Sequence, residues 1–349
     1  MGRAGWREGR KRRFAGFALL AFALSCDAGS FPARTTDAGT KGNPDALDAS
    51  NTTPTKDASG SPPLRVVVIS DMNGSYGSTA YEATVHGAIA HIQSLKPDLV
   101  LSTGDMVAGQ KSGLNYASMW SAFHAAVSDP LTQAGIPFAV TPGNHDASGY
   151  APFAAERNTF VSEWTPRKPN VTFVDDANYP LRYAFTMGEV LFVSLDDTTV
   201  GPLATEQMTW LEGVLTANEG YPAKVVFGHL PLYPFATENA DEVIGDTALE
   251  TLLNAHHVTA LVTGHHHAYY PGKRSALRMV GLACLGTGAR RLLGTDTPSK
   301  HSYVSFEIDG TGIRTLEAYA EPNFDVPVLR ETLPTSVGTG GRVILRDDM

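Results

Sequence analysis

Cysteine is scarce in this chain of 349 residues, which holds only Cys26 and Cys284. Two cysteines cannot form the disulfide framework that small exported domains use, so the fold must depend on its hydrophobic core. Hydrophobic residues make up 42% of the chain, enough for one large α/β domain or two small ones. Cys284 stands in the apolar segment "MVGLACLGTG", which is typical of a core strand, so we expect a buried, inert thiol.

Long apolar runs are also missing. The run from Phe14 to Leu24 has 11 residues, whereas about 20 are needed to span a bilayer. Because this run follows several arginines and ends at Ser25-Cys26, residues 1–25 are predicted to be a signal peptide. Cys26 after "ALS" resembles the lipidation site of bacterial lipoproteins, and the alternative is an ordinary signal peptide cut near Cys26. We therefore expect an exported protein, either a lipoprotein of the cell envelope or periplasm or a secreted protein.

Positive charge is scarce beyond the signal peptide. The whole chain has a formal net charge of −9, while residues 1–25 hold six Arg and Lys residues against Glu8 alone. Without this segment the net charge is −9 − 5 = −14. So acidic a protein is a poor candidate for binding nucleic-acid backbones, which requires many cations. Contact with a membrane is expected only through the N-terminal lipid anchor.

Large apolar residues are nearly absent from residues 27–63, which are rich in Asp, Ala, Gly, Ser, Thr and Pro. Such a segment cannot bury enough surface to offset the entropy lost on ordering. We therefore predict that residues 26–63, beginning with the anchor cysteine, form a disordered linker. A folded domain is predicted over residues 64–320, followed by a C-terminal extension over residues 321–349.

Within the predicted domain, short β-branched runs alternate with segments of helical periodicity, which favours βαβ units. The lengths of residues 79–95 and 116–134 suit crossover helices, and residues 205–217 and 247–255 repeat the arrangement. The later apolar runs lack intervening helices and predict an antiparallel end to the domain. Strands are expected at residues 65–70, 98–103, 137–141, 190–195, 224–227, 259–263, 277–285, 302–308 and 312–318.

Five of the early strands are followed by polar residues of one chemical kind. In open α/β sheets, ligands bind just beyond the carboxyl ends of the strands. A single Asp, Asn or His after a strand is commonly a turn or capping residue, but five in succession on one edge favour a metal site. The segments are "VISDMN", "LSTGD", "TPGNHD", "VFGH" and "VTGHHH".

These motifs resemble those of the calcineurin-like metallophosphoesterase superfamily, whose order is D-x-H, GD-x-x-D, GNH[DE], H and GH-x-H. The resemblance covers roughly residues 64–320 and implies an α/β fold, a four-layer α/β/β/α sandwich with mixed sheets and two metal ions at the sheet edge. It implies that Asp71, with Asn73 at the D-x-H position, and His267 hold the first ion. Asn144, His229 and His265 would hold the second, with Asp105 bridging both.

The resemblance also implies a reaction. His145 would stay off the metals as the general acid, and His266 would point elsewhere. Two divalent ions, less two carboxylates and a bridging hydroxide, leave a positive centre that attracts a phosphoryl group, and the hydroxide would attack phosphorus in line. The cofactors expected are two divalent or mixed-valence ions of Mn, Fe or Zn, and the partner is a small phosphorylated substrate.

Two positions depart from the family pattern. Asn73 stands where a histidine is usual, and Ala108 replaces the second aspartate of GD-x-x-D, which orients the acid in many relatives. An amide oxygen at Asn73 would favour harder ions such as Mn, Mg or ferric iron over Zn, whereas the alternative is that Asn73-Gly74 merely turns the chain. Asp146 and Asp197 are the two candidates for orienting His145.

The substrate is left open by the sequence. Arg290 and Arg291 could meet substrate oxygens, which would favour monoesters, although a solvated surface pair is the more ordinary reading. We predict a phosphatase-like hydrolase of phosphoric esters. The alternatives are a phosphodiesterase acting on nucleotides or lipid head groups, and a non-catalytic metal-binding envelope lipoprotein.

Overall fold

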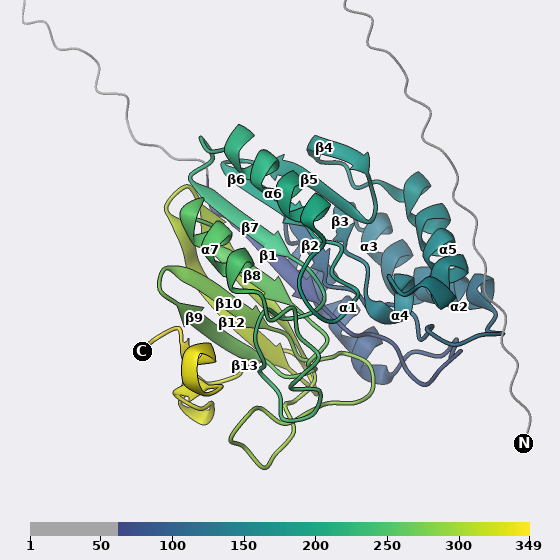
Figure 1. Ribbon diagram of the computed structural model, residues 1–349. Helices are drawn as coiled ribbons and strands as arrows, with labels where there is room; N and C mark the ends of the chain where they lie inside the picture. The colour runs from purple at the N-terminus through teal and green to yellow at the C-terminus, as the bar shows by residue number, and fades with distance from the viewer. Residues whose placement is uncertain (1–61) are drawn as a thin grey trace, which may run out of the picture. The chain divides into compact units, whose positions relative to one another are not determined.

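The computed structural model describes residues 62–349, and these form two β-sheets covered by helices (Figure 1). The predicted signal peptide, Cys26 and nearly all of the predicted linker lie outside the described residues. No helix in residues 62–349 is both long and apolar enough to cross a membrane.

The first sheet has six strands in the order β13-β12-β11-β1-β2-β3. Strands β1, β2 and β3 run parallel, as expected of βαβ units, and β11 pairs antiparallel with both β1 and β12. Their bounds are β1 Leu64–Ile69, β2 Leu99–Ser102, β3 Phe138–Val140, β11 Ser302–Asp309, β12 Gly312–Ala320 and β13 Val326–Pro327.

The second sheet has nine strands in the order β14-β15-β9-β10-β8-β7-β6-β5-β4. Strands β6, β7 and β8 are parallel, and β10 is parallel to β8 but antiparallel to β9, so the predicted antiparallel end holds only in part. Their bounds are β4 Thr172–Asn178, β5 Arg182–Met187, β6 Val190–Ser194, β7 Ala223–Phe227, β8 Ala260–Thr263, β9 Tyr270–Arg274, β10 Leu277–Gly281, β14 Ser336–Val337 and β15 Ile344–Arg346.

The helices lie on the outer faces of the two sheets. In Figure 1, α6 and α7 cross one face of the nine-stranded sheet. The segment predicted as a helix over residues 116–134 is broken by a π-helical turn over His124–Ser128. The helices are α1 Ala83–Leu95, α2 Tyr116–Phe123, α3 Asp129–Gln133, α4 Asn144–Ala147, α5 Ala154–Trp164, α6 Thr205–Ala217 and α7 Thr247–Ala255.

Strand alternation places a core on each side of the nine-stranded sheet. In β6, Val190 and Phe192 belong to the core shared with the six-stranded sheet, whereas Leu191 and Val193 pack in the core beneath α6 and α7. Helix α1 buries Val85, Ala88, Ile89 and Ile92, the spacing of one helical face, against the six-stranded sheet. The fold is therefore an α/β sandwich of four layers with two mixed sheets.

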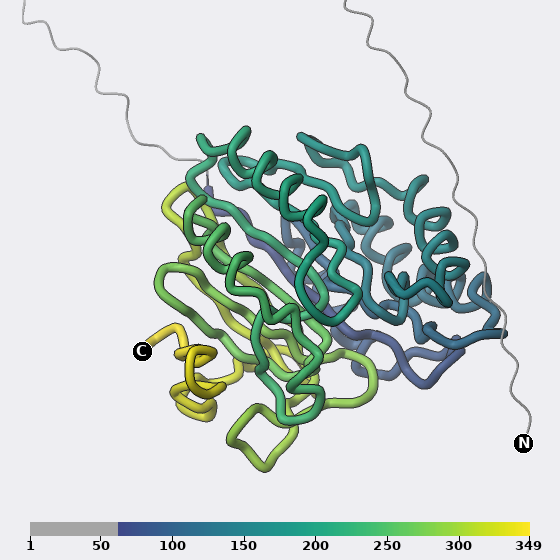
Figure 2. Tube along the Cα trace, viewed as in Figure 1, coloured from purple at the N-terminus to yellow at the C-terminus, as the bar shows by residue number. Residues whose placement is uncertain are grey.

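Residues after Ala320 extend the edges of both sheets. Strand β13 pairs with β12, while β15 pairs with β9 and β14 with β15. Figure 2 shows this yellow C-terminal segment beside β9. Arg330 anchors it through ion pairs with Glu317 and Asp347.

Candidate metal centre

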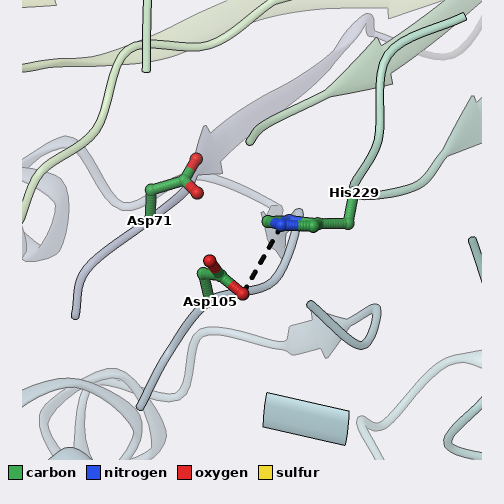
Figure 3. Close-up of side chains that lie close together, drawn as sticks. All are labelled: Asp71, Asp105 and His229. Atoms are coloured by element: carbon green, nitrogen blue, oxygen red, sulfur yellow. Dashed lines mark ion pairs between the residues drawn. The ribbon is translucent and has the colours of Figure 1, made fainter. Parts of the chain in front are cut away.

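The residues that follow the parallel strands lie together between the two sheets. Asp71 follows β1 and Asp105 follows β2, both in the six-stranded sheet, whereas His229 follows β7 in the other sheet. One ligand atom from each of these three buried residues lies within 4.8 Å of the others. Figure 3 shows the three side chains converging, with the pair of Asp105 and His229 marked.

The backbone is left-handed at four of the predicted ligands. Asp71, Asp105, His265 and His267 have φ angles of 49°, 54°, 62° and 48°. Non-glycine residues rarely adopt this conformation, which costs about 1–3 kcal/mol each and is concentrated at functional sites. The local glycines are needed for close approach, because a Cβ at Gly143 would lie 2.1 Å from the Asp105 nitrogen.

The second half of the predicted centre consists of Asn144, His229 and His265. The Nε2 atom of His229 lies 2.8 Å from Asn144 Oδ1 and 3.2 Å from His265 Nδ1. Asp105 Oδ1 lies 3.4 Å from the same nitrogen. Potential ligand atoms of Asn144, His265 and Asp105, from both sheets, therefore surround the Nε2 atom of His229.

Hydrogen bonds on the outer side of these residues determine which atoms face inward. His229 donates from Nδ1 to the Thr103 carbonyl at 2.8 Å, and His265 donates from Nε2 to Glu242 Oε2 at 2.8 Å. The Asn144 amide donates to Gln110 Oε1 at 3.0 Å. When both rings are neutral, the inward atoms are lone-pair acceptors, which repel one another unless a cation lies among them. This donor set fits a metal ion.

The first half of the predicted centre is the pair of Asp71 and His267, whose Oδ1 and Nε2 atoms lie 3.1 Å apart. His267 donates from Nδ1 to the Gly288 carbonyl at 2.9 Å, and within residues 62–349 the buried Asp71 Oδ1 has no polar partner besides His267. Burial opposes charge on both groups. Their attraction nevertheless holds the pKa of Asp71 below its ordinary value and raises the pKa of His267 to about 10.

Asn73 lies beside this pair, on the wall of the same cavity as Asp105 and His267. The chain does not turn at Asn73-Gly74, because the bend falls at Ser75–Gly77. Backbone bonds hold Asn73: its N–H donates to the Asp105 carbonyl at 3.1 Å, and its carbonyl accepts from Thr287 at 3.1 Å. Within residues 62–349 its carboxamide has no hydrogen-bond partner, which leaves the amide available to a ligand.

His145 reaches the cavity from the first turn of α4. Its Nδ1 donates to the Gly109 carbonyl at 3.2 Å, and its Nε2 lies 4.0 Å from Asp105 Oδ2. Ala108 is buried and offers no side chain to orient this ring. The neighbouring Gly109 carbonyl holds the ring instead.

Neither aspartate considered for orienting His145 bonds its ring. Asp146 accepts from the backbone of Met106, Val107 and Gly143, which fastens two motif loops together. Asp197 accepts from the His229 backbone at 2.7 Å, and burial raises its pKa to about 7. These two carboxyls position the backbone of the site.

Arg290 and Arg291 have different surroundings. Arg290 lines the cavity and donates to the His265 carbonyl, whereas Arg291 pairs with Glu238 at the surface, 2.8 Å apart. His266 points away, as expected, and its Nδ1 accepts from the Phe235 backbone at 3.1 Å. Of these two arginines, Arg290 is the one placed to meet a substrate.

The cavity has a volume of about 400 Å³. Its lining includes residues that the motifs did not indicate, among them Glu242 and Gln110, which orient His265 and Asn144, and Tyr76 beside His145. Glu242 and Gln110 are loop residues at no fixed spacing from their partners, so no sequence signal identifies them. Tyr76 could have been noticed in the sequence, because it is the one large side chain in the segment "NGSYG".

Comparison with known proteins identifies the family. The profile of the family described as Calcineurin-like phosphoesterase matches residues 64–269, more than half of the chain. The chain belongs to this family, whose members use a centre of two metal ions. The matched region begins at β1 and includes every predicted metal ligand.

The names of individual relatives describe several activities. Purple acid phosphatase 18 of Arabidopsis thaliana is 29% identical over 61% of this chain and 46% of its own length. A probable glycerophosphodiester phosphodiesterase, GpdQ of Arcobacter nitrofigilis, is 31% identical over 58% of this chain and 71% of its own length. The chain spans about half the length of the purple acid phosphatases it matches.

Solved structures support the fold. A purple acid phosphatase from yellow lupin seeds superposes with a TM-score of 0.56 at 19% identity, covering 74% of this chain and 51% of the lupin chain. The GAP50 anchor of the Plasmodium inner membrane complex gives 0.52 at 13% identity, covering 74% and 85%. At these identities the likeness concerns the fold alone.

Proposed function

We propose that this protein is a metal-dependent, phosphatase-like hydrolase of phosphoric esters. The observation that carries the proposal is the grouping of Asn144, His265 and Asp105 around His229 Nε2, which brings oxygen and imidazole ligands together. Family membership supports the same reaction class.

The residues divide between two ions of Mn, Fe or Zn. Asp71, Asn73 and His267 would hold the first ion, and Asn144, His229 and His265 the second, with Asp105 shared. When bound, the two ions supply Lewis-acid activation of water and of the phosphoryl group.

The chain itself handles the leaving group. The Gly109 carbonyl fixes the His145 ring through Nδ1, so Nε2, which carries the second proton when the ring is an imidazolium, faces the cavity. As the oxygen of water bonds to phosphorus, the bond from phosphorus to the ester oxygen breaks, and His145 gives its Nε2 proton to that oxygen. The products are the alcohol and the phosphate.

Arg290 favours a monoester, because a second negative charge on the substrate needs a cation near the metals. Its guanidinium donates to the His265 carbonyl through one nitrogen and retains other donors. A diesterase is the second candidate, favoured by relatives named as a glycerophosphodiester phosphodiesterase and a cyclic nucleotide phosphodiesterase.

The test is hydrolysis by the purified chain loaded with Mn, Fe or Zn. We expect an aryl phosphate to be hydrolysed faster than an aryl phosphodiester, with the activity lost to a chelator and in Asp105→Asn. Faster diester hydrolysis would support the second candidate. Hydrolysis of neither ester above the Asp105→Asn background would reject both and favour a non-catalytic metal-binding protein.

We also propose that the protein is exported and held at the cell envelope through lipid on Cys26, where it meets a small phosphorylated substrate. The support is the sequence of residues 1–26 alone. Cys26→Ser should move the protein from the membrane fraction to the soluble fraction of the producing cells. An unchanged distribution would contradict the anchor.

A further inference from the structure

Tyr76 is an exposed aromatic residue at the wall of the candidate site. Its side chain is 55% exposed, although most large apolar residues in the described part of the chain are buried. Within residues 62–349 its hydroxyl bonds no other residue, and the ring packs in neither hydrophobic core. Among the described residues, neither core packing nor a hydroxyl hydrogen bond therefore accounts for an aromatic side chain here.

The Tyr76 ring lies beside the predicted general acid, His145. The two ring centroids are 5.5 Å apart, with 55° between the planes. Because His145 protonates the leaving oxygen, the leaving group must lie on the His145 side of the cavity. The part of that group beyond the ester oxygen then meets Tyr76.

The lining of the cavity is mostly polar. The His265 side presents Glu242, Asn239 and Arg290, which are polar or charged. Among the described residues that line the cavity, Tyr76 is the sole Tyr, Phe or Trp. Lys111 places its amine 5.6 Å from the Tyr76 centroid, so the ring has a cation beside it.

We propose that the site takes phosphoric esters whose leaving group carries a planar aromatic ring, held by stacking on Tyr76 with Lys111 alongside. This rests on the proposed function and adds the substrate class. Stacking suits either a nucleobase carried on a sugar or an aryl ring bonded directly to the ester oxygen, because both present a flat π face.

A matched pair of substrates tests the ring. Adenosine 5′-monophosphate and ribose 5-phosphate have the same leaving oxygen and differ in the base, and phenyl phosphate supplies the aryl arm. For Tyr76→Leu we expect kcat/KM to fall about five- to ten-fold on the substrates that use the ring, near the lower end of base stacking energies. On ribose 5-phosphate it should stay within about two-fold. A loss on adenosine monophosphate alone identifies the nucleobase, and a loss on phenyl phosphate alone identifies the aryl ester.

Two variants serve as controls. Tyr76→Phe keeps the ring and should match the wild type, and Tyr150→Leu alters another exposed tyrosine, which does not line the cavity. An equal loss on all three substrates, or no loss on any, would overturn the proposal. The former would mean that Tyr76 acts on His145 itself.

Binding separates this proposal from the proposed function. Calorimetry of adenosine and phenol with the wild type and Tyr76→Leu needs no hydrolysis. Ring-dependent binding without hydrolysis of any ester would reject the proposed function and leave the aromatic site standing. If ribose 5-phosphate is hydrolysed, and adenosine and phenol bind equally well to the wild type and to Tyr76→Leu, the aromatic site is rejected and the proposed function stands.

Discussion

The two halves of the predicted metal centre are built differently. The second half draws Asn144, His229 and His265 from both sheets, with neighbouring ligand atoms 2.8–3.2 Å apart. The first half has the close pair of Asp71 and His267, and its third member, Asn73, lies in the loop after β1. Gln110 holds the Asn144 carboxamide, whereas no residue among 62–349 bonds the Asn73 carboxamide. An ion in the first half therefore has one ligand fewer in a fixed orientation, and we expect it to be bound more weakly.

Asp105→Asn should have the largest effect, because this residue touches both halves. Its Oδ1 accepts from the His145 backbone at 2.9 Å and lies 3.4 Å from His229 Nε2. Residues one step behind a metal cost about 10–100-fold when mutated, so loss of a shared ligand should exceed about 100-fold in kcat/KM. Kinetics and elemental analysis would measure this.

The control for that variant is Asp129→Asn, which removes a surface partner of Arg167. It should leave activity and metal content unchanged. Full metal content in Asp105→Asn, with thermal unfolding like the wild type, would show that Asp105 is not a shared ligand.

Glu242→Gln should weaken the second half alone. The carboxylate accepts from His265 Nε2, which leaves Nδ1 as the inward atom. An amide holds the ring less firmly and can reverse its tautomer, so we expect about a ten-fold or greater loss of affinity for one of the two ions. Metal titration of the apoprotein, followed by calorimetry, would resolve the two binding steps.

A nearby glutamate provides the comparison. Glu238→Gln removes a surface partner of Arg291 and should leave both binding steps unchanged. If Glu242→Gln weakens both ions equally, or neither, then Glu242 does not set the orientation of His265.

Gradual chelation should remove the ion of the first half before that of the second. We expect the Kd of the ion in the first half to be about ten-fold higher than that of the ion in the second half. Elemental analysis along a chelator titration should show a plateau at one ion per chain. Activity should already be lost at that plateau, because both ions act on the phosphoryl group. Simultaneous loss of both ions would show that the two halves bind their ions with similar affinity, which contradicts the prediction.

The sequence predicts the parts of this molecule that depend on local pattern. The parallel strands β1, β2, β3, β6, β7 and β8 were expected, and their carboxyl ends bring the polar residues together. The hairpin of β4 and β5 was not expected. Strand β4 is largely exposed, and Asp175 and Asp176 interrupt the apolar pattern by which a strand is recognised in a sequence. The π-helical turn at His124–Ser128, within residues 116–134, was not expected either.

The site divides in the same way. Residues next to glycines at strand ends could be predicted, because a tight turn after a strand leaves a local signature. The residues that orient them could not. Glu242 reaches His265 across 23 positions and Gln110 reaches Asn144 across 34, and contacts between loops so distant in sequence leave no periodic trace.

Asn73→His should give the smallest change and the sharpest test of the first half. The carboxamide lines the cavity, and a histidine there would restore the nitrogen ligand that the family pattern has at this position. We expect tighter binding of the first ion, by about ten-fold, and a shift in preference from Mn toward Zn, because imidazole suits Zn better than an amide oxygen does. Competition between Mn and Zn, read by elemental analysis, measures both effects.

Asn73→Ala is the control and should bind the first ion more weakly than the wild type. If both variants match the wild type in ion identity and occupancy, Asn73 is not a ligand, and the first half holds its ion through Asp71, Asp105 and His267 alone.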